Sequence, residues 1–338
     1  MIETPTIFVL GAGASLEYGF PLGGELTDWI VKWRTHPRFK DFQRNDLHIE
    51  EFINAVAGSE IETIDRFLEQ HDEFSLEGKY AITALLASRH GGDPKDGWYK
   101  FLWNKMLGAG GTGKHETPDD FLNGNKIAFV TFNYDVSLEI YLWNRLKHYF
   151  PKSNPEELGR ALEKIPVIHI HGKIQYSPWE KGIIPPVISI EGPLGITNNQ
   201  AAFEISKNIS LGHEQTSRLE AQKAKRLISK AQNIIFLGFG FHPVNVKKIV
   251  DEGEMIKVVE KYKISHETSS AVPESYIETG IKHYAFGEKH LSATAIKMSP
   301  AVKRAALGMG ALNGINFYDG GSIKEILNQS FDEMLSNK

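Results

Sequence analysis

A short apolar segment that runs directly into two closely spaced glycines places the strongest limit on how this chain can fold. Residues 7–10 (Ile-Phe-Val-Leu) are apolar with β-branched and aromatic members, which predicts a short buried strand. Gly11 and Gly13 follow where the chain must turn, and residues able to begin a helix come next. A strand, a glycine turn and a helix in this order leave backbone N–H groups at the positive end of the helix dipole, which suits an anionic phosphate. The segment therefore predicts an α/β fold with a phosphate-binding turn.

Two other interpretations exist for this turn. A glycine pair is a weak motif on its own, so the glycines could instead serve close packing alone. A nicotinamide-dependent dehydrogenase would place an acidic residue at the end of a second strand, about 20 residues further on. Residues 26–33 carry an amphipathic helical pattern instead, and Asp28 lies within it. The sequence therefore disfavours ordinary hydride transfer.

Composition narrows the chemistry further. The 338 residues include no cysteine, which excludes disulfides, thiol catalysis and any cysteine-ligated zinc. A formal net charge of -4 gives no general attraction to nucleic acid or to a membrane surface. No leader-like pattern precedes the first strand, and no apolar run reaches membrane-spanning length. We therefore expect a cytoplasmic protein without a membrane partner.

A long helical stretch follows the first α/β unit. Between residues 36 and 119, apolar residues recur at helical spacing and strand-like alternation is absent. This pattern predicts a helical insertion of residues 36–119 within a discontinuous sheet domain of residues 1–35 and 120–338. The glycine-rich residues 108–114 end in Gly-Lys, but they lack the strand, helix and hydroxyl residue of a triphosphate-binding loop. We interpret them as a linker.

Polar residues follow the next predicted strand. The apolar residues 126–132 end in Asn133 and Asp135, and a helix is predicted from residue 136 to residue 149. In an open parallel sheet, ligands bind beyond the carboxyl ends of the strands, so this pair is expected at a ligand site. The alternative for Asp135 is an N-cap of the following helix, where Asp is favoured.

A third strand is predicted over residues 166–172, which include its end and carry two histidines. His169 and His171 alternate with apolar residues, which predicts that both lie on one face of the strand. An imidazole at a strand end can accept a proton from a hydroxyl group or from water. The residues alone do not decide which of the two histidines would act as the base.

The remainder of the chain continues the α/β pattern. Residues 233–237 predict a strand that runs into a second glycine turn containing Gly238 and Gly240. A further strand is predicted over residues 281–286, followed by a helical stretch to about residue 308, and a last strand ends near Asp319. The predicted helix of residues 214–231 is densely basic, which favours a solvated face and leaves an acidic partner as the alternative.

The order of these motifs resembles the sirtuin family, in particular its bacterial branch of sirtuin-like NAD-hydrolysing proteins. The matching segments are Gly11-Ala12-Gly13-Ala14-Ser15, Phe132-Asn133-Tyr134-Asp135, His171-Gly172, Gly238-Phe239-Gly240 and Asp319-Gly320. The resemblance implies a Rossmann-like parallel sheet with helices on both faces, and it implies NAD as the bound substrate.

The resemblance also implies a role for each matched residue. Asn133 would lie beside the nicotinamide ribose and hold the water, Asp135 would lie near the carboxamide, and His171 would be the base. The pyrophosphate would lie against Gly11, Ala12, Gly13 and Ser15. The adenosine half would lie along Gly238, Gly240 and Asp319.

Two departures from the protein-deacylating sirtuins bear on the activity. Those enzymes carry a four-cysteine zinc ribbon, which this chain cannot form, so no zinc is expected. Their acidic, arginine-bearing segment after the first glycine turn is also missing from residues 19–25. The resemblance therefore implies an NAD glycohydrolase that uses water as acceptor and depletes NAD in antiphage (abortive infection) defence.

Other functions remain open at this point. A sensor that binds NAD or ADP-ribose without turnover would use the same glycine turns and would not need His171. An effector that depends on a partner would use the helical insertion or the basic helix as a docking surface. The resemblance implies self-assembly into a homo-oligomer and, for some relatives, a hexameric DNA-translocating ATPase as the partner.

Overall fold

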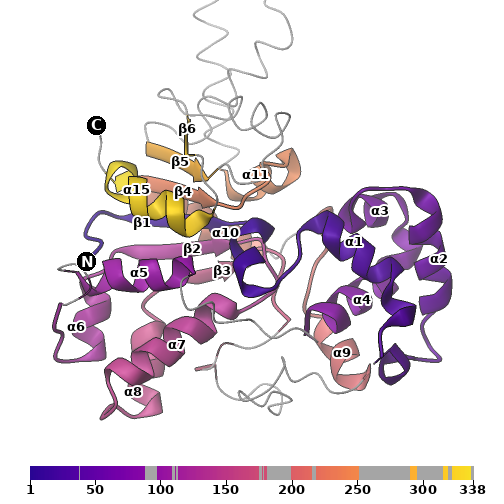
Figure 1. Cartoon of the computed structure of the whole chain (residues 1–338), viewed down its shortest axis with the longest axis horizontal. Coiled ribbons are helices and arrows are strands. Elements are labelled where there is room, and N and C mark those ends of the chain that lie inside the picture. Colours follow the sequence, from indigo (N-terminus) through magenta and orange to yellow (C-terminus); the bar gives the residue numbers. More distant parts are fainter. Residues whose placement is uncertain are drawn as a thin grey trace, which may run out of the picture.

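The computed structural model describes residues 1–37, 39–87, 97–108, 111, 113–174, 177, 179–180, 199–214, 218–250, 290–294, 315–318 and 322–335. Within these ranges, six parallel strands form one sheet in the order β3-β2-β1-β4-β5-β6 (Figure 1). The strands are β1 (Thr6–Leu10), β2 (Ile127–Thr131), β3 (Val167–His169), β4 (Asn233–Leu237), β5 (His290–Thr294) and β6 (Ile315–Tyr318). This is the strand order of dinucleotide-binding Rossmann folds, and it confirms the predicted α/β class.

Helices cover both faces of the sheet. The strand β1 is buried along its whole length, as expected for a strand in a parallel sheet packed on two sides. Phe8 packs in the same core as helices α5 (Trp98–Leu107), α7 (Ser137–Tyr149) and α15 (Ile323–Leu335). Its neighbour Val9 packs in a second core with α10 (Arg218–Lys230) and α11 (Pro243–Ile249). The alternation of side chains along β1 thus links two cores through one strand.

The other helices form a group beside the sheet and a pair near α7. In Figure 1, helices α1, α2, α3, α4 and α9 lie together to the right of the strands. Their bounds are Gly23–Val31, Ile49–Ser59, Ile64–Gln70, Ser75–Ala87 and Asn199–Ser206. Helices α6 (Pro118–Asn123) and α8 (Pro155–Leu162) pack on each other. Short 3-10 segments complete the described part: η1 (Ala12–Tyr18), η2 (Trp33–Thr35), η3 (Phe39–Phe42) and η4 (Asp72–Phe74).

The helices are grouped in space somewhat differently from the predicted residue ranges. Helix α5 falls inside the predicted insertion of residues 36–119, yet it packs on α15 and α7 at the sheet. Helix α9 comes from much later in the chain and packs on α4. The division into two domains stays a prediction, and these contacts show which helices are attached to the sheet.

Two expectations for the carboxyl-terminal part can be compared with the structure. Residues 290–294 form β5, so the prediction of a continuous helical stretch to about residue 308 is wrong there. Ser292 and Ala293 of this strand are completely buried, at 0% exposure. The predicted strand of residues 281–286 lies outside the described residues. Among the described helices, none combines the length and the apolar composition needed to cross a bilayer.

Candidate functional site at the carboxyl edge of the sheet

The two predicted glycine turns pack directly against each other. Strands β1 and β4 are neighbours, and their carboxyl ends meet at the point of the sheet where ligands bind in this class of fold. The Gly11 N–H donates to the Leu237 carbonyl (3.0 Å) and the Gly13 N–H donates to the Gly238 carbonyl (3.1 Å). The N–H groups of Gly11 and Gly13 therefore bond to the end of β4 and to the second glycine turn.

Close approach explains why these positions are glycines. A Cβ on Gly11 would lie 2.5 Å from the Gly238 carbonyl oxygen, and a Cβ on Gly238 would lie 2.2 Å from the Ala14 nitrogen. Gly238 also has a φ of 58°, in the left-handed region that favours glycine. The packing interpretation of the first turn thus describes its geometry, while pyrophosphate binding by this turn stays a prediction.

The first turn continues as a short 3-10 helix whose first residue is exposed. Segment η1 begins at Ala12, which is exposed, whereas Ser15 is buried. Gly240 of the second turn is also exposed, and a Cβ there would meet no atom within 4 Å. Asp319 lies outside the described residues, so its predicted place beside the adenosine half of NAD stays a prediction.

Asn133, the residue after the second strand, is anchored across the sheet to the first turn. Its Nδ2 donates to the Gly11 carbonyl and to the Ser15 Oγ, both at 2.9 Å. The Gly11 carbonyl can only accept, which fixes the orientation of the amide. Its main-chain N–H donates to Thr131 Oγ1 (3.1 Å). Both amide protons are therefore used, and Oδ1 is the atom that remains to accept a bond from a water or a ribose hydroxyl.

Asp135 is buried in a network of hydroxyl groups. Its Oδ1 accepts from the Ser137 N–H (3.1 Å) and from the Ser137 hydroxyl, and Ser15 also bonds to the carboxylate. Burial raises the pKa of Asp135, while the bonds from Ser137 and Ser15 lower it, and the net shift is upward. Ser15 thus contacts both Asn133 and Asp135, and brings two of the predicted site residues together at the first turn.

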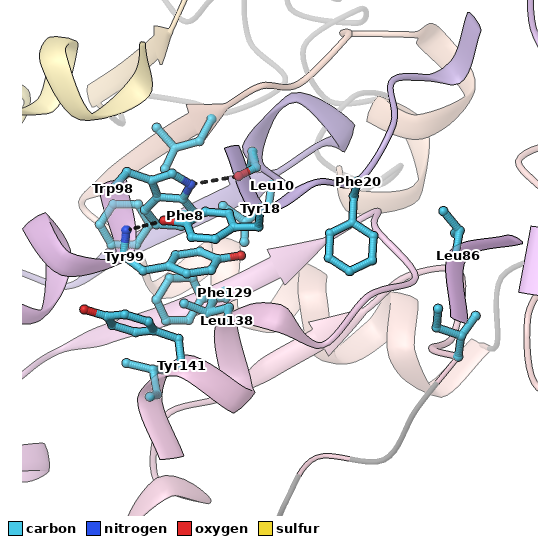
Figure 2. Close-up of a cluster of buried hydrophobic side chains, with 14 of the residues drawn as sticks. Phe8, Leu10, Tyr18, Phe20, Leu86, Trp98, Tyr99, Phe129, Leu138 and Tyr141 are labelled. Carbon is cyan, nitrogen blue, oxygen red and sulfur yellow. Dashed lines mark hydrogen bonds between the residues drawn. The ribbon is translucent and has the colours of Figure 1, made fainter. Parts of the chain in front are cut away.

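Helix α5 supports this network from the side. The Tyr99 hydroxyl lies 2.8 Å from Ser137 Oγ, and the Tyr99 main-chain N–H donates to the Tyr18 hydroxyl (2.8 Å). Figure 2 shows the Tyr18 ring lying over the Tyr99 ring, with a centroid separation of 3.7 Å. The neighbouring indole of Trp98 donates to the Ala14 carbonyl (2.8 Å). The first turn of α5 therefore fixes η1 and reaches the Asp135 side chain through one serine.

The two histidines point toward different helices. Strand β3 ends at His169, so the alternation does not extend to His171, and the prediction that they share a face is wrong. His169 Nδ1 lies 3.0 Å from the Asn133 carbonyl and its Nε2 lies 2.8 Å from Glu139 Oε1 on α7. His171 instead bonds to the side chain of Asn245 on α11. The structure thereby separates two residues that the sequence could not tell apart.

His171 lies in a mostly apolar and electropositive setting. It is 4% exposed, and its Nδ1 has no hydrogen-bond partner among the described residues. The Phe132 ring meets its edge at a centroid distance of 5.5 Å. Burial and the nearby Lys248 charge lower the pKa of His171 to about 3, so the ring is neutral near pH 7. Nδ1 is therefore a buried nitrogen whose lone pair accepts no hydrogen bond from the described residues.

Lys248 is a charged residue of the site that sequence reasoning missed. Its Nζ donates to the Gly212 carbonyl (2.6 Å) and to the Glu214 carbonyl (3.3 Å), which holds it near His171. Burial lowers the pKa of Lys248 to about 8, although Asp65 and Glu214 act in the opposite direction. Sequence reasoning also missed three other residues of the site: Tyr99, Ser137 and Glu139. The contacts from Tyr99 to Ser137 and from Glu139 to His169 span 38 and 30 positions in the chain, so no local pattern signals them. Within the described ranges, no cluster of three or more His, Asp or Glu residues could hold a metal ion.

A comparison with protein families matches one part of the chain. Residues 127–256, from β2 to just beyond α11, match the family model of the SIR2-like domain. The matched range contains Asn133, Asp135, His171 and the second glycine turn, whereas Gly11–Ser15 precede it. No curated protein matches the chain. SIR2-like proteins are commonly NAD-dependent enzymes, so this match implies NAD binding and supports a sirtuin-like family for the chain.

Proposed function

We propose that this protein is an NAD glycohydrolase that cleaves the bond between nicotinamide and the ribose C1′ of NAD⁺, with water as the acceptor. One observation carries the proposal. Asn133 bonds to the first glycine turn, and His171 is buried against Phe132, the residue directly before Asn133; both lie beyond strand ends in the SIR2-like segment. The atoms that could bond to a ligand are Asn133 Oδ1 and His171 Nδ1.

The chemistry follows from what these atoms can do. The C1′–N bond breaks with its electron pair leaving on nicotinamide, which departs as a neutral molecule from an oxocarbenium-like transition state. A water oxygen bonds to C1′ and loses one proton, giving ADP-ribose, nicotinamide and H⁺. Asn133 Oδ1 is suited to hold that water, because it can accept one of its hydrogen bonds. His171 Nδ1 is suited to receive the proton, because the ring is neutral.

The low pKa of His171 makes it a weak base in the free protein. Burial and the Lys248 charge both disfavour the imidazolium form. An anionic pyrophosphate near these groups would offset the Lys248 charge and raise the pKa of His171. Substrate binding would therefore strengthen the base at the moment when a water is present. Before NAD binds, burial and the Lys248 charge keep the His171 ring unprotonated.

The direct test is nicotinamide release from NAD by the purified full chain. We expect His171→Ala and Asn133→Ala each to lower the rate by about 10²-fold or more, the range for loss of a general base or a positioning group. His48→Ala is the matched control, since its side chain is 80% exposed and distant in role from the site. Full activity in either site variant, or no nicotinamide from wild type with or without a candidate partner, would contradict the proposal.

The same experiment separates the enzyme from a sensor. A module that only binds NAD or ADP-ribose would show tight binding by calorimetry, no nicotinamide, and no dependence on His171. The unpartnered Nδ1 of a buried His171 favours the enzyme, because a sensor has no use for a base at that position.

The biological role that we propose for this activity is NAD depletion in antiphage defence, and its support is the family resemblance. Assembly into a homo-oligomer and action with a DNA-translocating ATPase belong to the same proposal. Cellular NAD would fall in infected bacteria that carry the wild-type chain and stay constant in bacteria that carry His171→Ala. Equal NAD levels in both strains after infection would remove this part of the proposal.

A further inference from the structure

Residues 208–214, here called the connecting segment, run from the group of helices beside the sheet to the helices that cover the sheet. The segment follows α9, which packs on α4, and it leads toward α10, which packs on α11. Two of its residues, Ile209 and Leu211, are buried in the same core as Phe8. Its main chain passes the end of β3, where His171 lies. The connecting segment therefore lies between the helical group and the proposed base.

Toward the sheet, the connecting segment holds the main chain around His171. The Ser210 N–H donates to the His171 carbonyl (2.9 Å), and the Ser210 carbonyl accepts a bond from the Tyr134 hydroxyl (3.0 Å). Gly172, the next residue after the base, has a φ of 75°, and a Cβ there would lie 2.1 Å from the Asn208 carbonyl oxygen. Only glycine allows so close an approach. The course of the connecting segment thus determines the conformation of the chain directly after His171.

Toward the helical group, an ion pair holds the connecting segment to α4. Lys79 Nζ lies 2.7 Å from Glu214 Oε2, and the two side chains are 20% and 27% exposed. The same Glu214 oxygen accepts the Leu211 N–H (3.0 Å), so one carboxylate bonds both to α4 and to the main chain of the segment. On α3, the Asp65 carboxylate bonds to the Gly212 N–H. Two helices of the group therefore bond to the segment that bonds to His171.

We propose that Lys79 is a positioning residue, which holds the main chain of His171 in place through its ion pair with Glu214. The ion pair fixes the Glu214 carboxylate, and this carboxylate fixes Leu211 through its N–H. Ser210, the residue before Leu211, then holds the His171 carbonyl. Loss of Lys79 leaves a half-buried charge uncompensated, so the connecting segment should open more often. The helical group thereby acts on the proposed base.

Hydrogen exchange of the Ser210 amide in the full chain measures this link without an enzyme assay. Lys79→Met removes the ion pair, so exchange at Ser210 should become roughly 3- to 10-fold faster, while exchange in β1 stays constant. Lys105→Met is the matched control, because it breaks a bridge of similar length (2.8 Å) to Asp332 on α15. Unchanged exchange at Ser210 in Lys79→Met, or an equal increase in Lys105→Met, would overturn the proposal.

Two further variants identify the ion pair as the cause. Lys79→Arg keeps the positive charge and should restore slow exchange at Ser210. Glu214→Gln removes the charge of the other partner but keeps an oxygen for the Leu211 N–H, and it serves as the main test if Lys79→Met folds poorly. Its effect should not add to that of Lys79→Met, because both changes break the same pair. Additive effects in the double variant, or fast exchange in Lys79→Arg, would contradict the proposal.

The effect on catalysis rests on the proposed function and is measured separately. Lys79→Met should lower kcat for nicotinamide release by roughly 10-fold, less than the factor of about 100 that a 1 Å displacement of a positioned group costs. Lys79→Arg should restore kcat, and Lys105→Met should leave it unchanged. A wild-type kcat in Lys79→Met would overturn the positioning role. If wild type releases no nicotinamide, the proposed function fails, whereas the exchange measurement still decides whether Lys79 holds the segment at His171.

Discussion

Replacing Gly238 by alanine tests the contact between the two glycine turns. A Cβ at this position would lie 2.2 Å from the Ala14 nitrogen and 2.3 and 2.5 Å from the carbonyl carbon and Cα of Gly13. All three atoms belong to the backbone, so no side chain can rotate away. The turns would have to separate by about 0.8 Å to reach 3.0 Å, the shortest separation that real Cβ atoms tolerate.

The cost can be worked out from three contributions. Overpacking in a dense region costs about 1–3 kcal/mol, the left-handed backbone at φ 58° costs a non-glycine residue about 1 kcal/mol, and weakening of the bond from Gly13 to the Gly238 carbonyl costs about 1 kcal/mol. The total is roughly 3–5 kcal/mol. For a cooperative unit of this size, with an unfolding entropy of about 0.7 kcal/mol/K, Tm should fall by roughly 4–7 °C.

Differential scanning calorimetry is the measurement, and Gly240→Ala is the matched control. Gly240 lies in the same turn, but a Cβ there would meet no atom within 4 Å. We expect that variant to unfold within about 1 °C of wild type, because a surface substitution of this kind changes stability little. A Gly238→Ala protein that unfolds together with Gly240→Ala would refute the reasoning, since the turns would then not be in contact.

Three further predictions concern the site. Tyr99→Phe should lower the rate of nicotinamide release, because it removes the hydrogen bond to Ser137. Tyr149→Phe is the control, since it loses a similar hydroxyl hydrogen bond at the far end of α7. This control should lower the free energy of unfolding by about 1 kcal/mol and leave the rate unchanged. Lys248→Met removes a charge that lowers the pKa of His171, so the acid limb of kcat/KM should move to higher pH; an unmoved limb would contradict the assignment. Because the pKa of His171 is about 3 folded and 6.5 in the unfolded reference, the unfolded chain binds the proton first. Stability should therefore fall as pH drops from 6.5 toward 3, and His171→Gln should lose less over that range in urea titrations.

The central strands could be predicted from the sequence because each is a continuous apolar run that ends at a glycine or an amide. Residues 7–10 and 126–132 carry this pattern, and the structure places β1 and β2 there. Strand β5, which lies between β4 and β6, could not be predicted in the same way. Strand β5 contains a completely buried serine, Ser292, and a buried polar residue gives no apolar signal. Its pairing with β4 is a tertiary effect that overrides local preference.

The location of the site at the strand ends could be predicted from the sequence, but the contacts of its residues could not. Asn133 and Asp135 lie at a strand end, as the pattern indicated. The split between His169 and His171 depends on where β3 stops, and element ends are set by long-range packing rather than by local residues. The partners that define the roles of these residues, Glu139 and Lys248, come from two helices on opposite faces of the sheet.

The position of β1 in the middle of the sheet has a consequence for biosynthesis. Strand β1 pairs with β2, which begins at Ile127, and with β4, which begins at Asn233, and both of these strands are synthesised after it. At a translation rate of about 5–20 residues per second, this apolar strand waits roughly 10–50 seconds before its second neighbour exists. Such non-local pairing slows folding and leaves an apolar segment exposed, so that it can aggregate with other nascent chains. We therefore expect the yield of native protein in cells to depend on chaperones that shield the nascent segment containing β1.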